Sequence, residues 1–273
     1  SGKSKTFFVS MIRAILNKSS CLVYDPKGEL FAQTAGAAKT IYRLDLNDPT
    51  KSDRWNFIPK CRNDPAFACQ LAGMMIGIES RRRTNADPFW GDAEQIALTA
   101  ILLHIAEVYR EKAIPAFAAD FLLFLSGDSD QAFNEAMTNS PSLYANQAYM
   151  AFRQAPVQTR GSILIGLYNK LRPFTLAPAR MVTVAPTRDE EISGCRSINF
   201  ADLRKPGTAI YLIVSEGAAD MYKEFIATFI GQAVMEMRLD GVNEPEHPCF
   251  VLIDEAYQLN VSEVKRISGI GRG

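Results

Sequence analysis

Close to its end the chain reads Phe250-Val251-Leu252-Ile253-Asp254-Glu255, four apolar residues followed by two acidic ones. A short continuous apolar run predicts a strand that is buried on both faces of a parallel sheet. Ligands of such sheets bind outside the carboxyl ends of the strands, so an acidic side chain at that position faces the binding crevice. The alternative is a strand that simply ends in acidic residues at the surface.

The first residues carry a second signal. Ser1-Gly2-Lys3-Ser4 matches the end of a phosphate-binding loop, and the apolar residues from Ser4 to Leu16 repeat at the period of a helix. A nucleoside triphosphate requires backbone N–H groups around its phosphates, a nearby cation and a hydroxyl that holds magnesium. Gly2, Lys3 and Ser4 provide such a set, with Ser4 on the metal. Alone, so short a match also fits a solvated terminus.

The two signals together predict an ATPase site, because they are unlikely to coincide by accident. ATP and Mg2+ are the expected cofactors. We expect Asp254 to hold Mg2+ through water, and Glu255 to orient or deprotonate the attacking water.

Asp25 is a further candidate for cofactor binding. It closes another short apolar run, Cys21 to Tyr24, and is therefore expected at the same crevice. Asp25-Pro26-Lys27-Gly28 is equally a tight-turn sequence. The pattern favours neither interpretation.

The order of the remaining segments predicts the fold class. Ile41 to Leu46 and Ala209 to Val214 are two more strand candidates, and an amphipathic helix from Phe225 to Met237 follows the second. Strands that alternate with helices indicate a parallel sheet, and the predicted class is α/β.

Between these segments more than a hundred residues have a helical period and no convincing strand. The clearest helices run from about Asp92 to Arg110 and through Ile163 to Leu171, with Pro141, Pro156 and Pro173 as punctuation. We therefore predict a nucleotide-binding domain in two parts, 1–54 and 185–273, interrupted by an all-α domain at 55–184.

Composition limits the partners. Lys+Arg and Asp+Glu both total 30, so any contact with nucleic acid depends on local placement of charge. The five cysteines are scattered, and neither His104 nor His247 has a second ligand at metal-binding spacing. No apolar run is long enough to span a bilayer. Because a phosphate-binding loop normally follows a strand, we expect sequence before Ser1, and also beyond Gly273.

Three weaker features stay open. Arg272 could reach a neighbouring subunit's nucleotide, although a lone arginine is usually solvated. Arg81-Arg82-Arg83 could contact phosphates, but a solvated basic loop is the simpler interpretation. Phe89 and Trp90 could stack on a base, but we expect them in a helical core.

These motifs resemble one family, the type IV secretion coupling proteins, which are hexameric inner-membrane ATPases related to RecA and to FtsK/HerA-type translocases. The resemblance covers nearly the whole chain, and its most specific part is Asp25-Pro26-Lys27-Gly28-Glu29-Leu30. The other segments that carry it are Ser1 to Ser4, Thr34-Ala35-Gly36, Leu44 to Pro49, Ser52 to Asn56, Phe89-Trp90, Ile210 to Val214 and Leu252 to Glu255.

The resemblance implies a RecA-like P-loop domain interrupted by an all-α domain, a homohexamer, and Arg272 as a finger that acts across the subunit boundary. It also implies a location on the cytoplasmic side of the bacterial inner membrane, with attachment through an N-terminal segment. The implied partners are single-stranded DNA, the relaxase or relaxosome, secreted effector proteins and components of the type IV secretion channel.

The leading hypothesis is an ATP-driven pump that recruits DNA or nucleoprotein and moves it into a type IV secretion or conjugation channel. The alternative is a receptor for protein effectors that uses nucleotide as a conformational switch.

Overall fold

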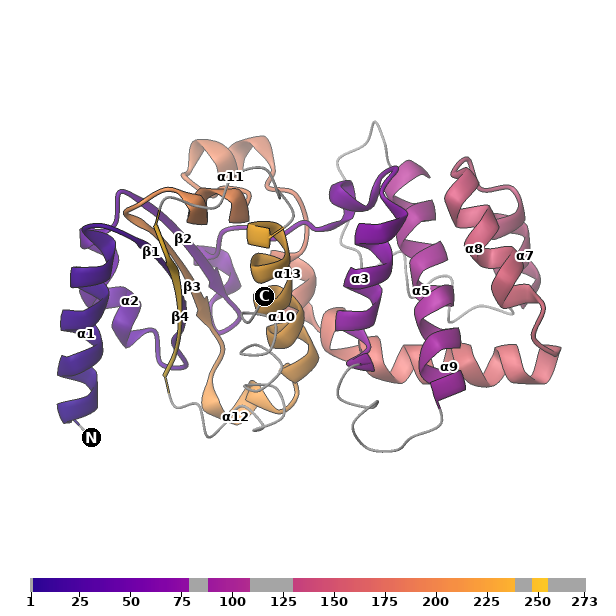
Figure 1. The fold of residues 1–273 in the computed structure, drawn as a ribbon, viewed down its shortest axis with the longest axis horizontal. Coiled ribbons are helices and arrows are strands. Elements are labelled where there is room, and N and C mark those ends of the chain that lie inside the picture. The colour runs from indigo at the N-terminus through magenta and orange to yellow at the C-terminus, as the bar shows by residue number, and fades with distance from the viewer. Residues whose placement is uncertain (1, 79–87, 109–129, 239–246, 255–273) are drawn as a thin grey trace. The chain divides into compact units, whose positions relative to one another are not determined.

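The computed structural model describes residues 2–78, 88–108, 130–238 and 247–254 (Figure 1). Its sheet is formed by β1 (Ser20–Tyr24), β2 (Thr40–Asp45), β3 (Thr208–Ile213) and β4 (Cys249–Ile253). They lie in the order β2-β3-β1-β4, and each neighbouring pair is parallel. The four predicted strands are therefore confirmed, to within one residue at either end.

Helices cover both faces of this sheet. α1 (Gly2–Leu16) and α2 (Glu29–Thr34) lie on one face, and α13 (Lys223–Arg238) lies on the other (Figure 1). β1 and β3 are buried along their whole length. Because they are covered on both faces, their sequences are continuous apolar runs rather than alternating ones.

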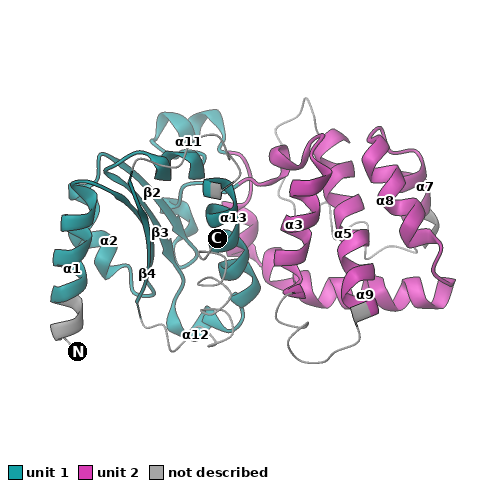
Figure 2. Cartoon of the chain, viewed as in Figure 1, with its two compact units in different colours: residues 1–55, 186–273 teal, residues 56–185 magenta. Residues whose placement is uncertain are grey.

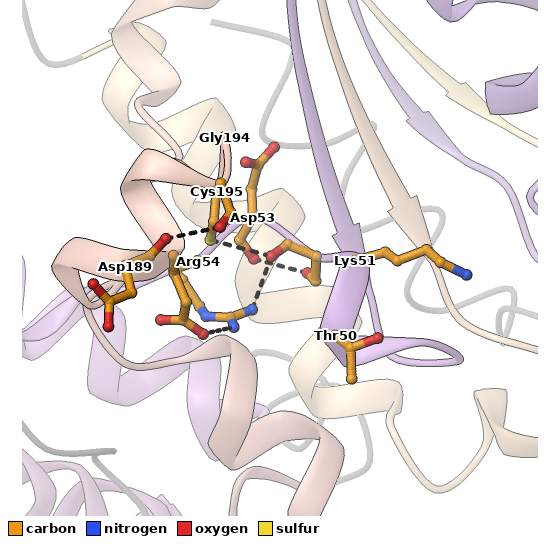
Figure 3. A pocket seen from close by; sticks show the side chains of 10 residues that line it. Thr50, Lys51, Asp53, Arg54, Asp189, Gly194 and Cys195 are labelled. Carbon is orange, nitrogen blue, oxygen red and sulfur yellow. Dashed lines mark hydrogen bonds and ion pairs between the residues drawn. The ribbon is translucent and has the colours of Figure 1, made fainter.

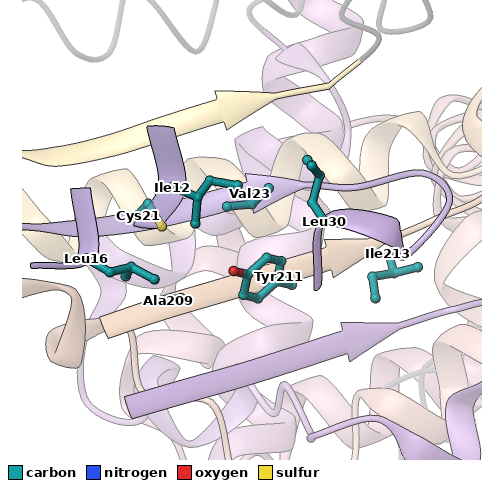
Figure 4. Packing of buried hydrophobic residues seen from close by; sticks show 8 residues of the cluster. All are labelled: Ile12, Leu16, Cys21, Val23, Leu30, Ala209, Tyr211 and Ile213. Atoms are coloured by element: carbon teal, nitrogen blue, oxygen red, sulfur yellow. The ribbon is translucent and has the colours of Figure 1, made fainter. Parts of the chain in front are cut away.

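The core beneath α1 and α2 is a single cluster of buried side chains (Figure 4). Burying one such side chain contributes about 1.5–3 kcal/mol, so the cluster holds both helices on the sheet. Its members are Ile12, Leu16, Cys21, Val23, Leu30, Ala209, Tyr211 and Ile213.

Short elements connect the larger ones. They are η1 (Ala35–Ala37), η2 (Pro49–Lys51), α11 (Arg188–Ile192), η4 (Phe200–Arg204) and α12 (Glu216–Ala219). α11 begins with a capping box, in which the Thr187 hydroxyl accepts from the Glu190 amide and the Glu190 carboxylate accepts from the Thr187 amide.

The chain divides into two compact units (Figure 2). Unit 1 contains Ser1–Trp55 and Pro186–Gly273, and thus the sheet; unit 2 is Asn56–Ala185. The chain therefore leaves unit 1 after Trp55 and returns to it at Pro186.

The described part of unit 2 consists of helices: η3 (Ile58–Cys61), α3 (Pro65–Met75), α5 (Pro88–Val108), α7 (Asp130–Thr138), α8 (Leu143–Arg153), α9 (Val157–Thr175) and α10 (Ala177–Val182). α5 is its central helix and contacts α3, α7, α8, α9 and η3. Residues 97–106 of α5 are all buried, because a helix that is apolar around its circumference needs neighbours on every side.

The helices predicted over 92–110 and 163–171 correspond to α5 and α9, although residues 109 and 110 lie outside the described residues. Pro156 precedes α9 as expected. Pro173 differs from the prediction, because it lies inside α9, which ends only two residues later. Proline in the last turn removes one helical hydrogen bond while the rest of the helix stays intact. Within the described ranges, no helix has both the length and the apolar character to cross a membrane.

Candidate functional site

The N-terminal end of α1 lies at the carboxyl edge of the sheet. A tight turn at Lys18 and Ser19 joins α1 to β1, with both amides donating to the Ile15 carbonyl at 3.1 and 2.8 Å. The turn reverses the chain, so α1 runs back along β1 and starts near the end at which β1 finishes (Figure 1). The first N–H groups of a helix have no partner within that helix and attract anions. Gly2, Lys3 and Ser4 belong to this turn of helix, although their side chains lie outside what the structure describes.

Asp25 and Asp254 meet at the same edge. β1 and β4 are neighbours, with Tyr24 opposite Ile253, and each aspartate is the next residue of its strand. The Asp254 amide donates to the Tyr24 carbonyl at 3.1 Å, so the pairing continues as far as the acidic residue. The structure thus places two carboxylates on adjacent strand ends, beside the start of α1.

The Asp25 side chain has two distinct environments. Its Oδ2 accepts from the Phe31 amide at 2.8 Å, and its backbone carbonyl accepts from the Gly28 amide at 3.2 Å, as a turn residue would. Its Oδ1 is buried and has no hydrogen-bond partner among the described residues. One oxygen therefore supports the turn, while the other is buried without a hydrogen bond from the described residues.

The electrostatics of Asp25 follow from this placement. The side chain is only 1% exposed, and burial raises its pKa. Amides of the following turn, with Phe31 the strongest, favour the charged form, whereas the negative charge of Asp254 opposes it. The net direction of the pKa is upward.

The turn after Asp25 depends on Gly28, whose φ is +69°. A side chain at Gly28 would have room, since its nearest neighbour, Ile213, would lie 3.7 Å from a Cβ atom. The requirement is therefore the left-handed backbone, which glycine adopts without steric cost. Gly28 directs the chain into α2, whose amide at Phe31 holds Asp25.

Several predicted residues lie outside the described part of the chain. Glu255 and Arg272 belong to this group, as do the three arginines at 81–83. Phe89 and Trp90 are described, and the expectation that they are core residues is wrong, because they are 50% and 43% exposed. They stack edge to face on each other at the start of α5, with ring centroids 5.5 Å apart.

A second polar region was missed by the sequence analysis. Unit 1 has a pocket of about 420 Å³ beside β2, lined by residues 50–54, 189, 190 and 193–195 (Figure 3). Arg54 is 4% exposed there, pairs with Glu190, and donates to the carbonyls of Pro49 and Ser52 at 3.1 and 2.8 Å. The Cys195 thiol donates to the same Ser52 carbonyl at 3.4 Å.

Backbone hydrogen bonds also join the segment around Arg54 to the segment that follows Cys195. The Arg54 amide donates to the Arg196 carbonyl, and the Ile198 amide donates to the Arg54 carbonyl, both at 2.8 Å. Asp53 accepts from the amides of Arg43 and Arg196, each at 2.9 Å. These residues flank the two places where the chain leaves and re-enters unit 1, so we call residues 52–55 and 186–198 the root of the insertion.

No sequence motif would have identified the root. Arg54 and Glu190 are 136 residues apart, and neither belongs to a pattern that predicts its partner. The described residues also contain no group of three or more His, Cys, Asp or Glu side chains arranged to hold a metal ion.

Comparison with known proteins identifies the family of this chain. A family model described as type IV secretory system conjugative DNA transfer matches residues 1–263. A search of curated proteins by sequence finds no match.

Three solved structures share the fold. The plasmid coupling protein TrwB in complex with the non-hydrolysable ATP analogue ADPNP has a TM-score of 0.63 at 14% identity, over 93% of this chain and 54% of that one. TrwB with the GTP analogue GDPNP has a TM-score of 0.55 at 13% identity, over 92% and 61%. Unbound TrwBdeltaN70, a bacterial conjugative coupling protein, has a TM-score of 0.56 at 12% identity, over 95% and 60%.

The chain thus spans little more than half the length of the solved structures that it matches. The likeness confirms the predicted α/β class with a parallel, RecA-like sheet. Together with the family model over nearly all residues, it shows that this chain belongs to the type IV secretory system family of conjugative DNA-transfer coupling proteins.

Proposed function

We propose that this chain binds ATP with Mg2+ at the carboxyl edge of its sheet and hydrolyses it. The observation that carries the proposal is the pair Asp25 and Asp254 on adjacent strand ends, beside the start of a helix that begins Gly2-Lys3-Ser4. Phosphates favour the helix start, and carboxylates at strand ends favour the metal that accompanies them. TrwB, which shares the fold, is solved with nucleotide analogues.

Each residue has a proposed role. The amides of Gly2 and Lys3 and the Lys3 ammonium bind the phosphates, and Asp25 lines the crevice. Ser4 and Asp254 hold Mg2+, which neutralises phosphate charge when it is bound. Glu255 orients and deprotonates the attacking water.

We further propose that hydrolysis drives single-stranded DNA, or DNA with its relaxase, into a type IV secretion channel. The active form is a homohexamer at the cytoplasmic side of the bacterial inner membrane, in which Arg272 reaches the nucleotide of the neighbouring subunit. The equal totals of acidic and basic residues mean that DNA contacts are few and local.

The test is the rate of ATP hydrolysis with and without single-stranded DNA. We expect stimulation by DNA in the unaltered protein and its loss in Glu255→Gln and Arg272→Ala. Lys3→Ala removes nucleotide binding, whereas Lys18→Ala, a matched change at an exposed turn residue, leaves the rate unchanged. Normal turnover in Lys3→Ala would refute the nucleotide site.

A second candidate is a receptor for secreted effector proteins that uses nucleotide as a switch. Unit 2 favours it, because Leu143, Val157 and Ile165 are exposed by 68%, 63% and 65% on its helices. Contiguous exposed apolar patches mark protein-binding surfaces, so this candidate requires that these side chains belong to one such patch. Nucleotide binding without any response of the ATPase rate to DNA would favour this receptor over the pump.

A further inference from the structure

Among the residues that the structure describes, no positive charge is found to act on the Asp25 carboxylate. Asp25 is almost completely buried, one of its oxygens has no hydrogen-bond partner among the described residues, and the charge that acts on it is another carboxylate, Asp254. Lys27, in the same turn, forms an ion pair with Glu216 at 2.7 Å. Burying an ionised group without an opposite charge is costly, so such an arrangement indicates a missing cationic partner.

Asp53 shows how the same unit treats a buried aspartate that has only a structural role. Asp53 is 7% exposed, and burial raises its pKa too. Both of its oxygens accept backbone amides, from Arg43 and Arg196, and the arginines Arg196 and Arg54 supply positive charge. At Asp25 the Phe31 amide donates to Oδ2 and the amides of Leu30 and Glu29 also favour the charged form, but Oδ1 has no hydrogen-bond partner among the described residues and the neighbouring charge is negative. The difference lies in what each carboxylate faces, because burial is similar.

A divalent cation would supply the positive charge that Asp25 lacks among the described residues. Adjacent strands lie about 4.8 Å apart, so residues that follow paired positions can bring their carboxylates to one ion. Mg2+ takes oxygen ligands and is usually bound by one or two carboxylates together with phosphate oxygens and water. Asp25 Oδ1 and the Asp254 carboxylate supply the two carboxylates, and a nucleotide at the start of α1 supplies the phosphates.

We infer that Asp25 is a second carboxylate for the nucleotide-bound Mg2+, acting together with Asp254. The inference rests on the proposed nucleotide site and adds the residue that fixes its metal. The amide of Phe31 holds Asp25 Oδ2, so Oδ1 keeps a fixed direction. Asp25 is thereby a metal-positioning residue as well as a turn residue.

The experiment measures the metal directly. Mn2+ replaces Mg2+, and electron paramagnetic resonance reports its affinity in the presence of a non-hydrolysable ATP analogue. We expect Asp25→Asn to weaken Mn2+ binding roughly tenfold or more, in line with the loss of a charged metal ligand or of its orienting partner. Asp53→Asn is the matched control and should leave the Mn2+ affinity unchanged.

Thermal unfolding without nucleotide distinguishes an effect of each substitution on metal binding from an effect on the stability of the fold. Asp25→Asn keeps an oxygen for the Phe31 amide and removes a repelled charge, so its melting temperature should equal or exceed that of the unaltered protein. Asp53→Asn should melt lower, because an NH2 group then faces a backbone N–H. A lower melting temperature in Asp25→Asn, or unchanged Mn2+ affinity, would overturn the inference.

Failure of the nucleotide site itself would look different. If Lys3→Ala retains full affinity for the ATP analogue, the proposed function is wrong and no metal role at this edge follows. If Lys3→Ala loses the analogue while Asp25→Asn binds both analogue and Mn2+ normally, the nucleotide site stands and only the role of Asp25 is refuted.

Discussion

Replacing Arg54 with alanine is expected to destabilise unit 1 strongly. The guanidinium is buried and bonds three groups from two distant segments: the carbonyls of Pro49 and Ser52, and the carboxylate of Glu190. Alanine removes all three bonds and, within the described part of the chain, leaves the Ser52 carbonyl with only the weak bond from the Cys195 thiol.

The magnitude can be worked out from these contacts. Hydrogen bonds from a charged donor contribute about 1.5–3 kcal/mol each, and breaking a buried ion pair costs about 3–5 kcal/mol. Glu190 is partly exposed and can be rehydrated, which lowers the second figure. Arg54 Nε is buried without a partner among the described residues, and its removal recovers a little free energy. We expect a net loss of about 4 kcal/mol in the free energy of unfolding, about 3 kcal/mol from the two carbonyl bonds and about 1 kcal/mol from the ion pair.

Tryptophan fluorescence is a suitable assay. The chain has two tryptophans, and Trp55 is buried in the root while Trp90 is on α5 of unit 2. In a Trp90→Phe background, urea unfolding followed by fluorescence therefore reports on unit 1. A matched control is Lys51→Ala, whose exposed ion pair with Asp48 is screened by solvent and should contribute little to stability.

A double-mutant cycle then isolates the ion pair. Combining Arg54→Ala with Glu190→Gln should give a coupling energy of about 1 kcal/mol, with the remainder assigned to the two carbonyls. The reasoning is refuted if Arg54→Ala costs less than about 1 kcal/mol, or if Glu190→Gln alone costs as much as Arg54→Ala.

Three further changes test other contacts. Trp55→Phe should cost about 1–3 kcal/mol in unit 1 unfolding, because it removes the 2.9 Å bond to Gln232 and leaves that amide oxygen unsatisfied. Gly28→Ala should cost about 1–2 kcal/mol by thermal unfolding, since alanine is strained at a φ of +69°. Burial lowers the pKa of His104 to about 4, so stability should fall as pH drops from 6.5 to 5, by about 2 kcal/mol, and His104→Gln should remove that dependence.

Each of these has a clear contrary outcome. Equal stability of Trp55→Phe would mean that the stacking on Phe225 and Phe229 suffices without the hydrogen bond. An unaffected Gly28→Ala would show that the turn relaxes to another backbone conformation. An unchanged pH profile in His104→Gln would assign the acid sensitivity to other groups.

The sequence was sufficient to predict the sheet, for a physical reason. Parallel strands that helices cover on both faces must be apolar throughout, so β1 and β3 appear as uninterrupted runs. The same rule predicts that Asp25 and Asp254 lie at the carboxyl edge, although the sequence left a role for Asp25 in a tight turn equally open. Local pattern and global fold agree at these positions.

The root could not be predicted, because its contacts are long-range and polar. Nothing in residues 52–55 specifies that Arg54 meets Glu190 or that Trp55 bonds Gln232, 177 residues away. The prediction that Phe89 and Trp90 are core residues was wrong for a related reason. Aromatic residues at the start of an apolar helix are usually covered, and whether a neighbour covers them depends on the packing of α5 in unit 2.

Asp53 and Asp25 are both buried in unit 1, but their surroundings indicate a structural role for Asp53 and a ligand-binding role for Asp25. At Asp53 the fold supplies amides and arginines, and the carboxylate holds the root together. At Asp25 the fold supplies amides of the following turn and a like charge but no positive charge among the described residues, and the nearby Lys27 pairs with Glu216. A chain selected for stability alone would neutralise Asp25 or replace it with asparagine. The presence of a buried carboxylate with one unbonded oxygen is explained if its partner is a cation that arrives with the nucleotide.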